Sequence, residues 1–321
     1  MTIVITGVAG FLGSHLCKEL LAKGRRVIGI DNFSTGRERN LNEVIGHPDF
    51  FLINDDVTNK RVVEFSLLSG VEEIYHLASP ASPKFYQLAP FETIAVNTIG
   101  TQHMLEVAKR NNAKLLYAST SEAYGDPEQH PQAEDYRGNV NTWGPRACYD
   151  EAKRLGEVMC YEYYHRHQVQ VKVARIFNTY SDGLRNDDGR VISNFVTQAL
   201  TGRDITVYGD GSQTRSFCYV DDNIRALQMM MEKDQATGEI INIGNPDEHR
   251  IIDVARMVKR LAGSESGITY HPLPQDDPKV RRPVIDKARQ MLGWTPEISL
   301  EEGLKRMIKA YRTELMLQSK V

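Results

Sequence analysis

The sequence has few of the features that mark secreted, metal-binding or nucleic-acid-binding proteins. Among its 321 residues only four are cysteine, and none forms a C-x-x-C pair. They are Cys17, Cys148, Cys160 and Cys218. A disulfide framework or zinc site is therefore not expected, and a reducing cytoplasm is the expected location. His165 and His167 form an H-x-H pair, but residues two apart diverge on a helix, so no metal is expected.

Long apolar runs and an excess of one charge are also missing. No apolar run approaches the roughly 20 residues that span a bilayer, so no membrane partner is expected. Met1 leads directly into an apolar run, and no signal peptide is expected. The net charge is -3 with dispersed Lys and Arg, so no nucleic-acid partner is expected. The length suits one large domain with a smaller one appended.

A glycine-rich turn follows the first apolar run, Thr2–Thr6, which is typical of a buried strand. Gly7, Gly10 and Gly13 form a G-x-x-G-x-x-G pattern, and residues 14–23 continue as an amphipathic helix. Glycines at such a turn let the backbone approach a pyrophosphate, and the helix N-terminus then faces the phosphates. The pattern predicts a dinucleotide-binding site.

The second predicted strand, residues 26–30, ends in Asp31. A carboxylate at that position can accept hydrogen bonds from ribose hydroxyls and would repel a 2′-phosphate. The sequence therefore favours NAD over NADP. Arg37 and Arg39 lie close by in the sequence and leave NADP open as the alternative.

Strands and helices alternate through the first half of the chain. Further strands are predicted at residues 50–53, 73–77, 114–118 and 169–174, and helices at 60–68, 93–111 and 149–167. This alternation predicts an α/β fold, a Rossmann-like doubly wound parallel sheet covered on both faces. After about residue 174 strands shorten, and helices are predicted at residues 190–200, 251–261 and 300–317. We predict a cofactor-binding domain at 1–175, to which later segments return, and a smaller, discontinuous mixed α/β substrate domain at 176–321.

Side chains at the carboxyl ends of the predicted strands complete the cofactor site. Asp56 and Val57 follow the third strand, where a side chain can reach the adenine. Leu77 and Ser79 follow the fourth strand, against the nicotinamide side of the site.

Tyr149 and Lys153 stand four residues apart at the head of a predicted helix. That spacing puts the phenol and the ammonium on one helix face. A cation beside a phenol lowers the phenol pKa from about 10 towards neutrality. Such pairs also occur on exposed helix faces, but together with a dinucleotide motif the pair predicts a general base for a sugar hydroxyl.

Further motifs extend over nearly the whole chain. They lie at residues 31–37, 76–83, 119–122, 144–151, 174–180, 188–191, 208–217 and 275–278. With them the chain resembles the extended short-chain dehydrogenases/reductases that act on nucleotide sugars, and within that family the UDP-glucuronate decarboxylases. The resemblance implies an NAD-dependent carboxy-lyase that binds a UDP-sugar. Tyr149 would take the proton of the C4 hydroxyl during oxidation at C4, and the 4-keto acid would lose CO2. Lys153 and Tyr149 would stabilise the enolate oxygen before protonation and re-reduction give UDP-xylose.

Within the resemblance, Ser121 and Glu122 distinguish decarboxylation from the reactions of related nucleotide-sugar enzymes. Hexose 4,6-dehydratases carry Asp-Glu here, and their Asp expels a hydroxyl as water. Decarboxylation has no such leaving group, and a further carboxylate would repel that of the substrate. Ser121 would instead hydrogen-bond the carboxylate, and Thr120 would bond the sugar oxygen near the catalytic tyrosine. Glu122 would orient the sugar or relay the C5 proton.

The resemblance also implies the ligand contacts. Arg215 and Arg281 would bind the diphosphate or the sugar, because forked donors suit phosphate oxygens; Arg282 is the alternative to Arg281. Asn178 would bond the substrate, and Arg190 either the nucleotide sugar or the NAD pyrophosphate. The full set expected to contact NAD is Gly7, Gly10, Phe11, Leu12, Gly13, Asp31, Asn32, Phe33, Thr35, Gly36, Asp56, Val57, Leu77, Ser79, Tyr149, Lys153 and Arg190.

Some positions depart from the resemblance. They are Ala95-Val96 in place of Lys-Thr, Thr142-Trp143 in place of Pro-Ile, Ser181-Asp182 in place of Gly-Pro, and Val284 in place of Asp. These changes are expected to cluster around the sugar site. They leave open a different nucleotide sugar, with 4,6-dehydration or 4-epimerisation, and release of UDP-4-keto-xylose. A redox-inactive binding protein is a further alternative, against which the intact catalytic pair argues.

A homodimer is expected from the same resemblance. The predicted helices 93–111 and 149–167 would pair with those of a second copy as a four-helix bundle. Met104, Val107, Met159 and Tyr163 are candidates for this interface, although ordinary core positions would carry the same residues.

Overall fold

A computed structural model describes residues 1–273 and 280–318. Its largest element is a seven-stranded sheet with the order β11-β6-β5-β4-β1-β2-β3, in which each pairing is parallel. The strands are β1 (Thr2–Thr6), β2 (Arg26–Asp31), β3 (Phe50–Asn54), β4 (Glu73–His76), β5 (Lys114–Thr120), β6 (Val171–Ile176) and β11 (Ile240–Ile243). The strand order reverses beside β1, which is where a doubly wound sheet opens a crevice for ligands. The predicted Rossmann-like fold is confirmed.

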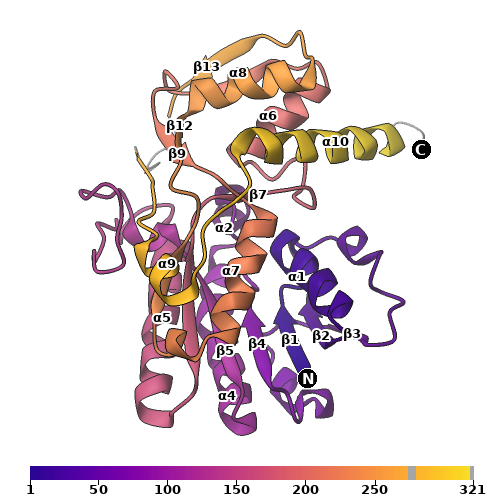
Figure 1. Ribbon diagram of the computed structural model, residues 1–321, viewed down its shortest axis with the longest axis vertical. Helices are drawn as coiled ribbons and strands as arrows, with labels where there is room; N and C mark the ends of the chain where they lie inside the picture. Colours follow the sequence, from indigo (N-terminus) through magenta and orange to yellow (C-terminus); the bar gives the residue numbers. More distant parts are fainter. Residues whose placement is uncertain (274–279, 319–321) are drawn as a thin grey trace.

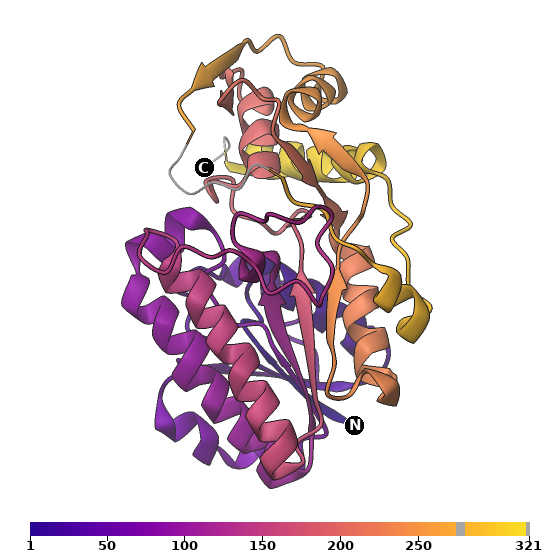
Figure 2. The same ribbon diagram turned by 90° about the vertical axis from the view of Figure 1, so that its left-hand side faces the viewer.

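Helices cover both faces of this sheet, as Figure 2 shows for α5 and α7. The helices are α1 (Phe11–Ala22) and α7 (Val220–Glu232) on one face, and α4 (Thr101–Asn111) and α5 (Ala147–His167) on the other. Alternation along β1 explains the two layers, because successive side chains of a strand point to opposite faces. Ile3 packs in one core cluster with Leu16 and Ile224, whereas Val4 packs in the other with Met104.

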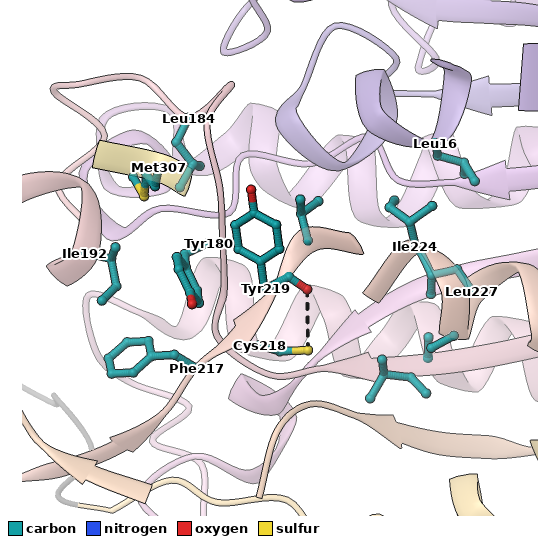
Figure 3. Packing of buried hydrophobic residues seen from close by; sticks show 14 of the residues in the cluster. Leu16, Tyr180, Leu184, Ile192, Phe217, Cys218, Tyr219, Ile224, Leu227 and Met307 are labelled. Carbon is teal, nitrogen blue, oxygen red and sulfur yellow. Dashed lines mark hydrogen bonds between the residues drawn. The ribbon is translucent and has the colours of Figure 1, made fainter. Parts of the chain in front are cut away.

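A smaller group of elements lies beyond the carboxyl ends of the strands, in the upper part of Figure 1. Its helices are α6 (Val191–Leu200), α8 (Ile251–Ala262) and α10 (Leu300–Gln318). Its strands form three pairs: β7 (Thr179–Tyr180) with β10 (Cys218–Tyr219), β8 (Ile205–Tyr208) with β13 (Ile268–His271), and β9 (Thr214–Ser216) with β12 (Glu248–Arg250). One core cluster runs from α1 and α7 into these elements, through residues such as Tyr180, Phe217 and Met307 (Figure 3).

Several helices differ from their predicted extents. The predicted helix 60–68 is two short 3-10 turns, η2 (Lys60–Glu64) and η3 (Ser66–Leu68), because Phe65 between them is extended. The predicted helix 93–111 is α3 (Pro90–Ala95), a π-helical turn η4 (Val96–Gly100) and α4. The elements α7, α9 (Asp286–Leu292) and β11 were not predicted. The remaining short elements are α2 (Pro83–Leu88), η1 (Glu38–Leu41), η5 (Ser121–Tyr124) and η6 (Asp234–Ala236).

Candidate active site

The glycine turn after β1 is closed by contacts that exclude larger side chains. Gly7 has a positive φ of 71°, and its amide donates to Ile30 O at 2.8 Å. A Cβ atom on Gly13 would lie 2.2 Å from the Gly7 carbonyl oxygen, so that position also requires glycine. Gly10 caps α1, whose first turn carries no acidic residue. The free amides and positive end of α1 therefore suit a pyrophosphate.

Asp31 lies at the end of β2 with its carboxylate held by the backbone. Its oxygens accept hydrogen bonds from the amides of Ala9 and Phe33, each at 2.8 Å. Burial raises the pKa of this carboxyl. Asp31 also lines a cavity of about 320 Å³, so the carboxylate is placed to meet ribose hydroxyls there.

Arg37 and Arg39 are bonded to other residues and do not line this cavity. The Arg37 Nη2 atom donates to the carbonyls of Gly183 and Leu184 at 2.9 and 2.7 Å. Both guanidinium groups also pair with Glu314 of α10. Because neither arginine lines the cavity beside Asp31, the structure favours NAD over the NADP alternative.

Most of the residues expected to contact NAD line two adjoining cavities. The cavity beside Asp31 is lined by Gly7, Gly10, Asn32, Thr35, Gly36, Asp56, Val57, Leu77 and Ser79. A second cavity, of about 110 Å³, adds Phe11, Leu12, Gly13 and Arg190. Phe33 lines neither of them; it has a φ of 57° and packs against the core. These residues fit a dinucleotide that crosses the turn at the N-terminus of α1.

Tyr149 and Lys153 lie in the first turns of α5, and both are buried. They line a cavity of about 120 Å³, here called the catalytic cavity, together with Thr120, Ser121 and Glu122. The Lys153 Nζ atom donates to Ala118 O at 2.7 Å and lies 5.8 Å from the centroid of the Tyr149 ring. The predicted catalytic residues are thus brought together.

The expected lowering of the Tyr149 pKa is wrong for this structure. Burial raises the pKa of Tyr149, and the hydrogen bond with Thr120 offsets only part of that shift. Lys153 does not supply the missing charge, since its ammonium faces the Ala118 carbonyl and burial lowers its own pKa to about 7. Spacing along the helix had indicated the shared face but not the burial of both groups.

Glu122 follows β5 in η5, where its carboxylate lies between two guanidinium groups. Arg146 donates to one oxygen at 2.5 Å, and Arg281 donates to the other. Burial alone would raise the pKa of Glu122, but the two arginines outweigh burial and lower it to about 2. An ionised, doubly bonded carboxylate is a poor proton carrier, so the geometry favours orientation of the sugar over proton relay.

A cavity of about 350 Å³, here called the arginine cavity, adjoins the catalytic cavity. Four of the five predicted substrate-binding residues line it: Asn178, Arg190, Arg215 and Arg281. The fifth, Tyr149, lines the catalytic cavity. Glu122, Asn178 and Arg190 line both cavities, which makes the two continuous. Arg190 pairs with Asp188, its Nη2 atom 3.0 Å from Oδ2. Arg282 lines neither cavity, so Arg281 is the better of the two candidates.

Tyr86 and Arg146 line the arginine cavity and were missed by the sequence analysis. The Tyr86 ring stacks on Tyr149, and its buried hydroxyl has no hydrogen-bond partner among the described residues. Arg146 is the residue that precedes α5. The available signal for it was its place in the 144–151 motif, three residues before Tyr149.

The departures from the resemblance do not cluster around the sugar site as expected. Val96 lines the cavity beside Asp31, on the cofactor side. Asp182 instead pairs with His15 at 3.4 Å, and the Val284 amide bonds Gln132 O at 2.8 Å. Trp143 is 94% exposed. Neither the catalytic cavity nor the arginine cavity is lined by any of the departing residues.

The 275–278 motif lies outside the described residues.

Within residues 1–273 and 280–318, no three His, Cys, Asp or Glu side chains gather in a way that could hold a metal ion. In the same residues no helix combines the length and apolar character needed to cross a membrane.

The fold and the site together define a class of nucleotide-sugar enzyme. The chain belongs to the family described as GDP-mannose 4,6 dehydratase, whose model matches residues 4–307. Among its relatives, UDP-glucuronic acid decarboxylase 1 of Danio rerio is 52% identical over 99% of this chain and 74% of that protein. UDP-glucuronic acid decarboxylase 6 of Arabidopsis thaliana is 49% identical over 100% of this chain and 91% of that protein. The resemblance drawn from the motifs is confirmed.

Solved structures agree with this class. The UDP-glucose 4-epimerase of Thermotoga maritima, with UDP-glucose, superposes with a TM-score of 0.91 at 29% identity, covering 98% of this chain and 100% of that one. The UDP-glucuronic acid 4-epimerase of Bacillus cereus, in complex with UDP-glucuronic acid and NAD, has a TM-score of 0.88 at 30% identity and the same coverage.

Proposed function

We propose that this protein is an NAD-dependent UDP-glucuronate decarboxylase that produces UDP-xylose. The observation that carries the proposal is the continuity of the cavities. Leu77 and Ser79 line both the cofactor side and the catalytic cavity, and Glu122 and Arg190 link the catalytic cavity to the arginine cavity. A bound dinucleotide, the Tyr149 phenol and an anionic sugar nucleotide would therefore lie next to one another in connected cavities.

The chain's own residues would hold NAD at its two ends. The N-terminus of α1 would bind the pyrophosphate, and Asp31 would accept hydrogen bonds from the ribose hydroxyls. When bound, NAD accepts a hydride from C4 of the sugar and later returns it. The NAD carried by related solved structures supports this choice of cofactor.

Tyr149 would act on the C4 oxygen. It would take the hydroxyl proton during oxidation, with the Thr120 hydroxyl beside it. Once Tyr149 has taken that proton, burial, which raises its pKa, would keep the proton on the phenol and leave it as a hydrogen-bond donor. That donor would stabilise the enolate oxygen that forms as CO2 leaves the 4-keto acid. Lys153, held by Ala118 O, would keep a positive or polar group near the same oxygen.

Ser121 and the arginines would place the sugar and its carboxylate. Ser121 is buried in the catalytic cavity and would donate a hydrogen bond to the carboxylate. Glu122 would orient the sugar while holding Arg146 and Arg281 in the adjoining cavity. Arg190, Arg215 and Asn178 would bind the diphosphate and sugar hydroxyls.

A second candidate, 4-epimerisation of a UDP-sugar, is favoured by the solved structures of epimerases with TM-scores near 0.9. Purified protein incubated with UDP-glucuronate and NAD, followed by mass spectrometry and chromatography of the nucleotide sugar, separates the candidates. Loss of CO2 supports decarboxylation, and the product mass distinguishes UDP-xylose from UDP-4-keto-xylose. An isomer of unchanged mass would establish the epimerase instead. The Tyr149→Phe variant is the matched control.

We further propose a homodimer formed through α3, η4 and α5. Met104 and Val107 are fully buried in the core and cannot form the interface. The same helices carry a set of exposed apolar residues, here called the dimer face: Phe91, Ile94, Ile99, Leu155 and Val158. A second copy would cover it.

The proposal includes the cellular location and the ligand that each part of the chain would bind. The four cysteines are free thiols, in keeping with a cytoplasmic location. Residues 1–175, with α7 and β11 returning to their sheet, would hold the cofactor. The remaining part of residues 176–321 would hold the nucleotide sugar.

A further inference from the structure

The second cofactor cavity, of about 110 Å³, is lined by three separate parts of the chain. The first is the glycine turn after β1, and the second is α2 with its N-cap residue. The third is the loop before α6, residues 183–189, which is here called the strap. The residues that line this cavity from the strap and from α2 are Gly183, Leu184, Arg185, Asp188, Ser82 and Phe85.

Asn40 joins the strap to the glycine turn. Its side-chain nitrogen donates to Ala9 O of the turn at 2.9 Å and to Gly183 O of the strap at 3.1 Å. Arg37 adds bonds to the carbonyls of Gly183 and Leu184. Because Asn40 is itself buried, this end of the strap is firmly held.

The other end of the strap is bonded to the N-terminus of α2. The Ser82 hydroxyl, which is buried, donates to Asp188 O at 2.5 Å. Residues 77–81 lead from Ser82 back to β1, where the Ala78 amide donates to the Thr6 hydroxyl at 3.1 Å. The glycine turn, the strap and α2 therefore form a closed ring around the second cofactor cavity.

Charged side chains form a further contact between the strap and α2. The Lys84 Nζ atom donates to Asp187 O at 2.7 Å and to Asp187 Oδ2 at 2.9 Å. The Lys84 ammonium and the Arg185 guanidinium lie 5.4 and 5.3 Å from the centroid of the Phe85 ring. Because the side chains of Lys84 and Asp187 are exposed, their ion pair is weak compared with buried contacts. The ring is therefore expected to open between the strap and α2.

Both ends of the strap are glycines with a positive φ. The φ of Gly183 is 82°, and that of Gly189 is 90°. Glycine has no Cβ atom, so its backbone can rotate through this region at little steric cost. The two glycines are suited to act as hinges on which the strap moves away from α2.

NAD bound between Asp31 and Tyr149 has to pass through this ring. The second cofactor cavity shares Phe85 with the cavity beside Asp31, and Arg190 with the catalytic cavity. It therefore lies between the ribose end and the nicotinamide end of the site. A dinucleotide that passes through a closed ring cannot leave sideways unless the ring opens.

We propose that the strap and α2 form a gate for NAD, and that separation of Lys84 from Asp187 sets the rate at which the cofactor enters and leaves. The gate rests on NAD as the cofactor and does not depend on which nucleotide sugar is the substrate. Lys84 and Asp187 bond each other, and neither lines a cofactor cavity. Loss of their contact should therefore speed entry and exit alike, and the affinity for NAD should change less than either rate.

Exchange of bound NAD for NADH measures the opening of the gate. NAD-loaded protein would be mixed with excess NADH, whose fluorescence reports the departure of NAD, and NADH association would be followed with cofactor-free protein. Because an exposed ion pair contributes little, Lys84→Ala and Asp187→Asn should each accelerate both processes by roughly two- to fivefold. The double variant should exchange no faster than Asp187→Asn alone, because both changes break one contact.

Lys114→Ala is the matched control. Lys114 forms an ion pair of the same length, 2.9 Å, with Asp234, and neither residue lines a cofactor cavity. Both rates should therefore be unchanged in this variant.

The outcomes separate the gate from the proposed function, because the experiment uses no nucleotide sugar. Unaltered exchange in Lys84→Ala and Asp187→Asn, or faster exit with unchanged entry, would overturn the gate and leave NAD as the cofactor. Effects that add up in the double variant would do the same. Failure of the unaltered protein to bind NAD or NADH would overturn both the gate and the proposed function.

Discussion

The aromatic rings of Tyr86 and Tyr149 lie face to face, with centroids 4.9 Å apart and planes 5° apart. Tyr86 comes from α2 and Tyr149 from α5, so the contact joins two helices at the catalytic cavity. The stack restricts the position of the Tyr149 phenol, and the Tyr86 hydroxyl contributes a buried donor to the arginine cavity.

Replacing Tyr86 separates these two contributions. Tyr86→Ala removes the stack, and because such a contact is worth about 0.5–1.5 kcal/mol, kcat should fall by roughly 3- to 10-fold. Tyr86→Phe keeps the stack and removes the hydroxyl, so it should raise KM for the nucleotide sugar with a smaller change in kcat. Steady-state kinetics of both variants is the measurement. Equal kcat in Tyr86→Ala and the unaltered protein would contradict a positioning role.

Replacing Tyr149 tests the general base. Tyr149→Phe should reduce turnover by at least about 10²-fold, the lower range for loss of a general acid–base group. NAD should stay bound, because the glycine turn and Asp31, which would hold it, line a different cavity from Tyr149. Rates measured with UDP-glucuronate, alongside NAD binding by fluorescence, check both statements. Substantial residual turnover would refute the assigned role.

Replacing Glu122 tests the clamp between the two arginines. Glu122→Gln leaves two buried guanidinium groups without their carboxylate, a change that costs about 3–5 kcal/mol in comparable buried pairs. We expect a lower free energy of unfolding in urea and a large loss of activity. Glu128→Gln, at an exposed loop position, is the control and should leave unfolding unchanged. An unaltered urea midpoint for Glu122→Gln would show that the pairing does not stabilise the fold.

His76 predicts acid-sensitive stability. It is fully buried between Thr6 and Thr101, and burial lowers its pKa to about 3. Its unfolded pKa is about 6.5, so the unfolded state binds the extra proton between these values and stability falls as the pH drops below 6.5. At pH 5 the loss is about 2 kcal/mol. Urea unfolding between pH 7 and 5 measures it.

The His76→Gln variant tests whether His76 causes that loss of stability in acid. His76→Gln keeps a polar side chain but removes the titration, so its stability should change less between pH 7 and 5. His167→Gln, at an exposed site on α5, should behave like the unaltered protein. The same pH slope in His76→Gln would place the sensitive group elsewhere.

A charged substitution on the dimer face tests the proposed homodimer. Val158→Lys places a charge where a second copy would bury the side chain, and we expect a monomer in analytical ultracentrifugation at micromolar concentration. Tyr270→Lys, at an exposed position on β13, should remain dimeric. A monomer before any substitution would reject the dimer.

Local sequence patterns predicted the first half of the fold well. The strands from β1 to β6 and the helix α5 follow from apolar runs and helical spacing, which act over a few residues. The predicted helix at 60–68 was wrong in type, because extended Phe65 interrupts it. β11 and α7 escaped prediction because their place in the large sheet and its cover depends on partners far away in the chain, β6 and α1.

The sequence by itself determined the glycine turn, the acidic end of β2 and the Tyr149–Lys153 spacing, since each depends on neighbours within a few residues. Only the tertiary structure decided which charges meet. Glu122 and Arg281 are 159 positions apart, yet they form one buried pair. The same folding buries Tyr149 and raises its pKa, against the expectation from spacing. Burial and long-range pairing set the charge of a group, and neither is encoded by local spacing.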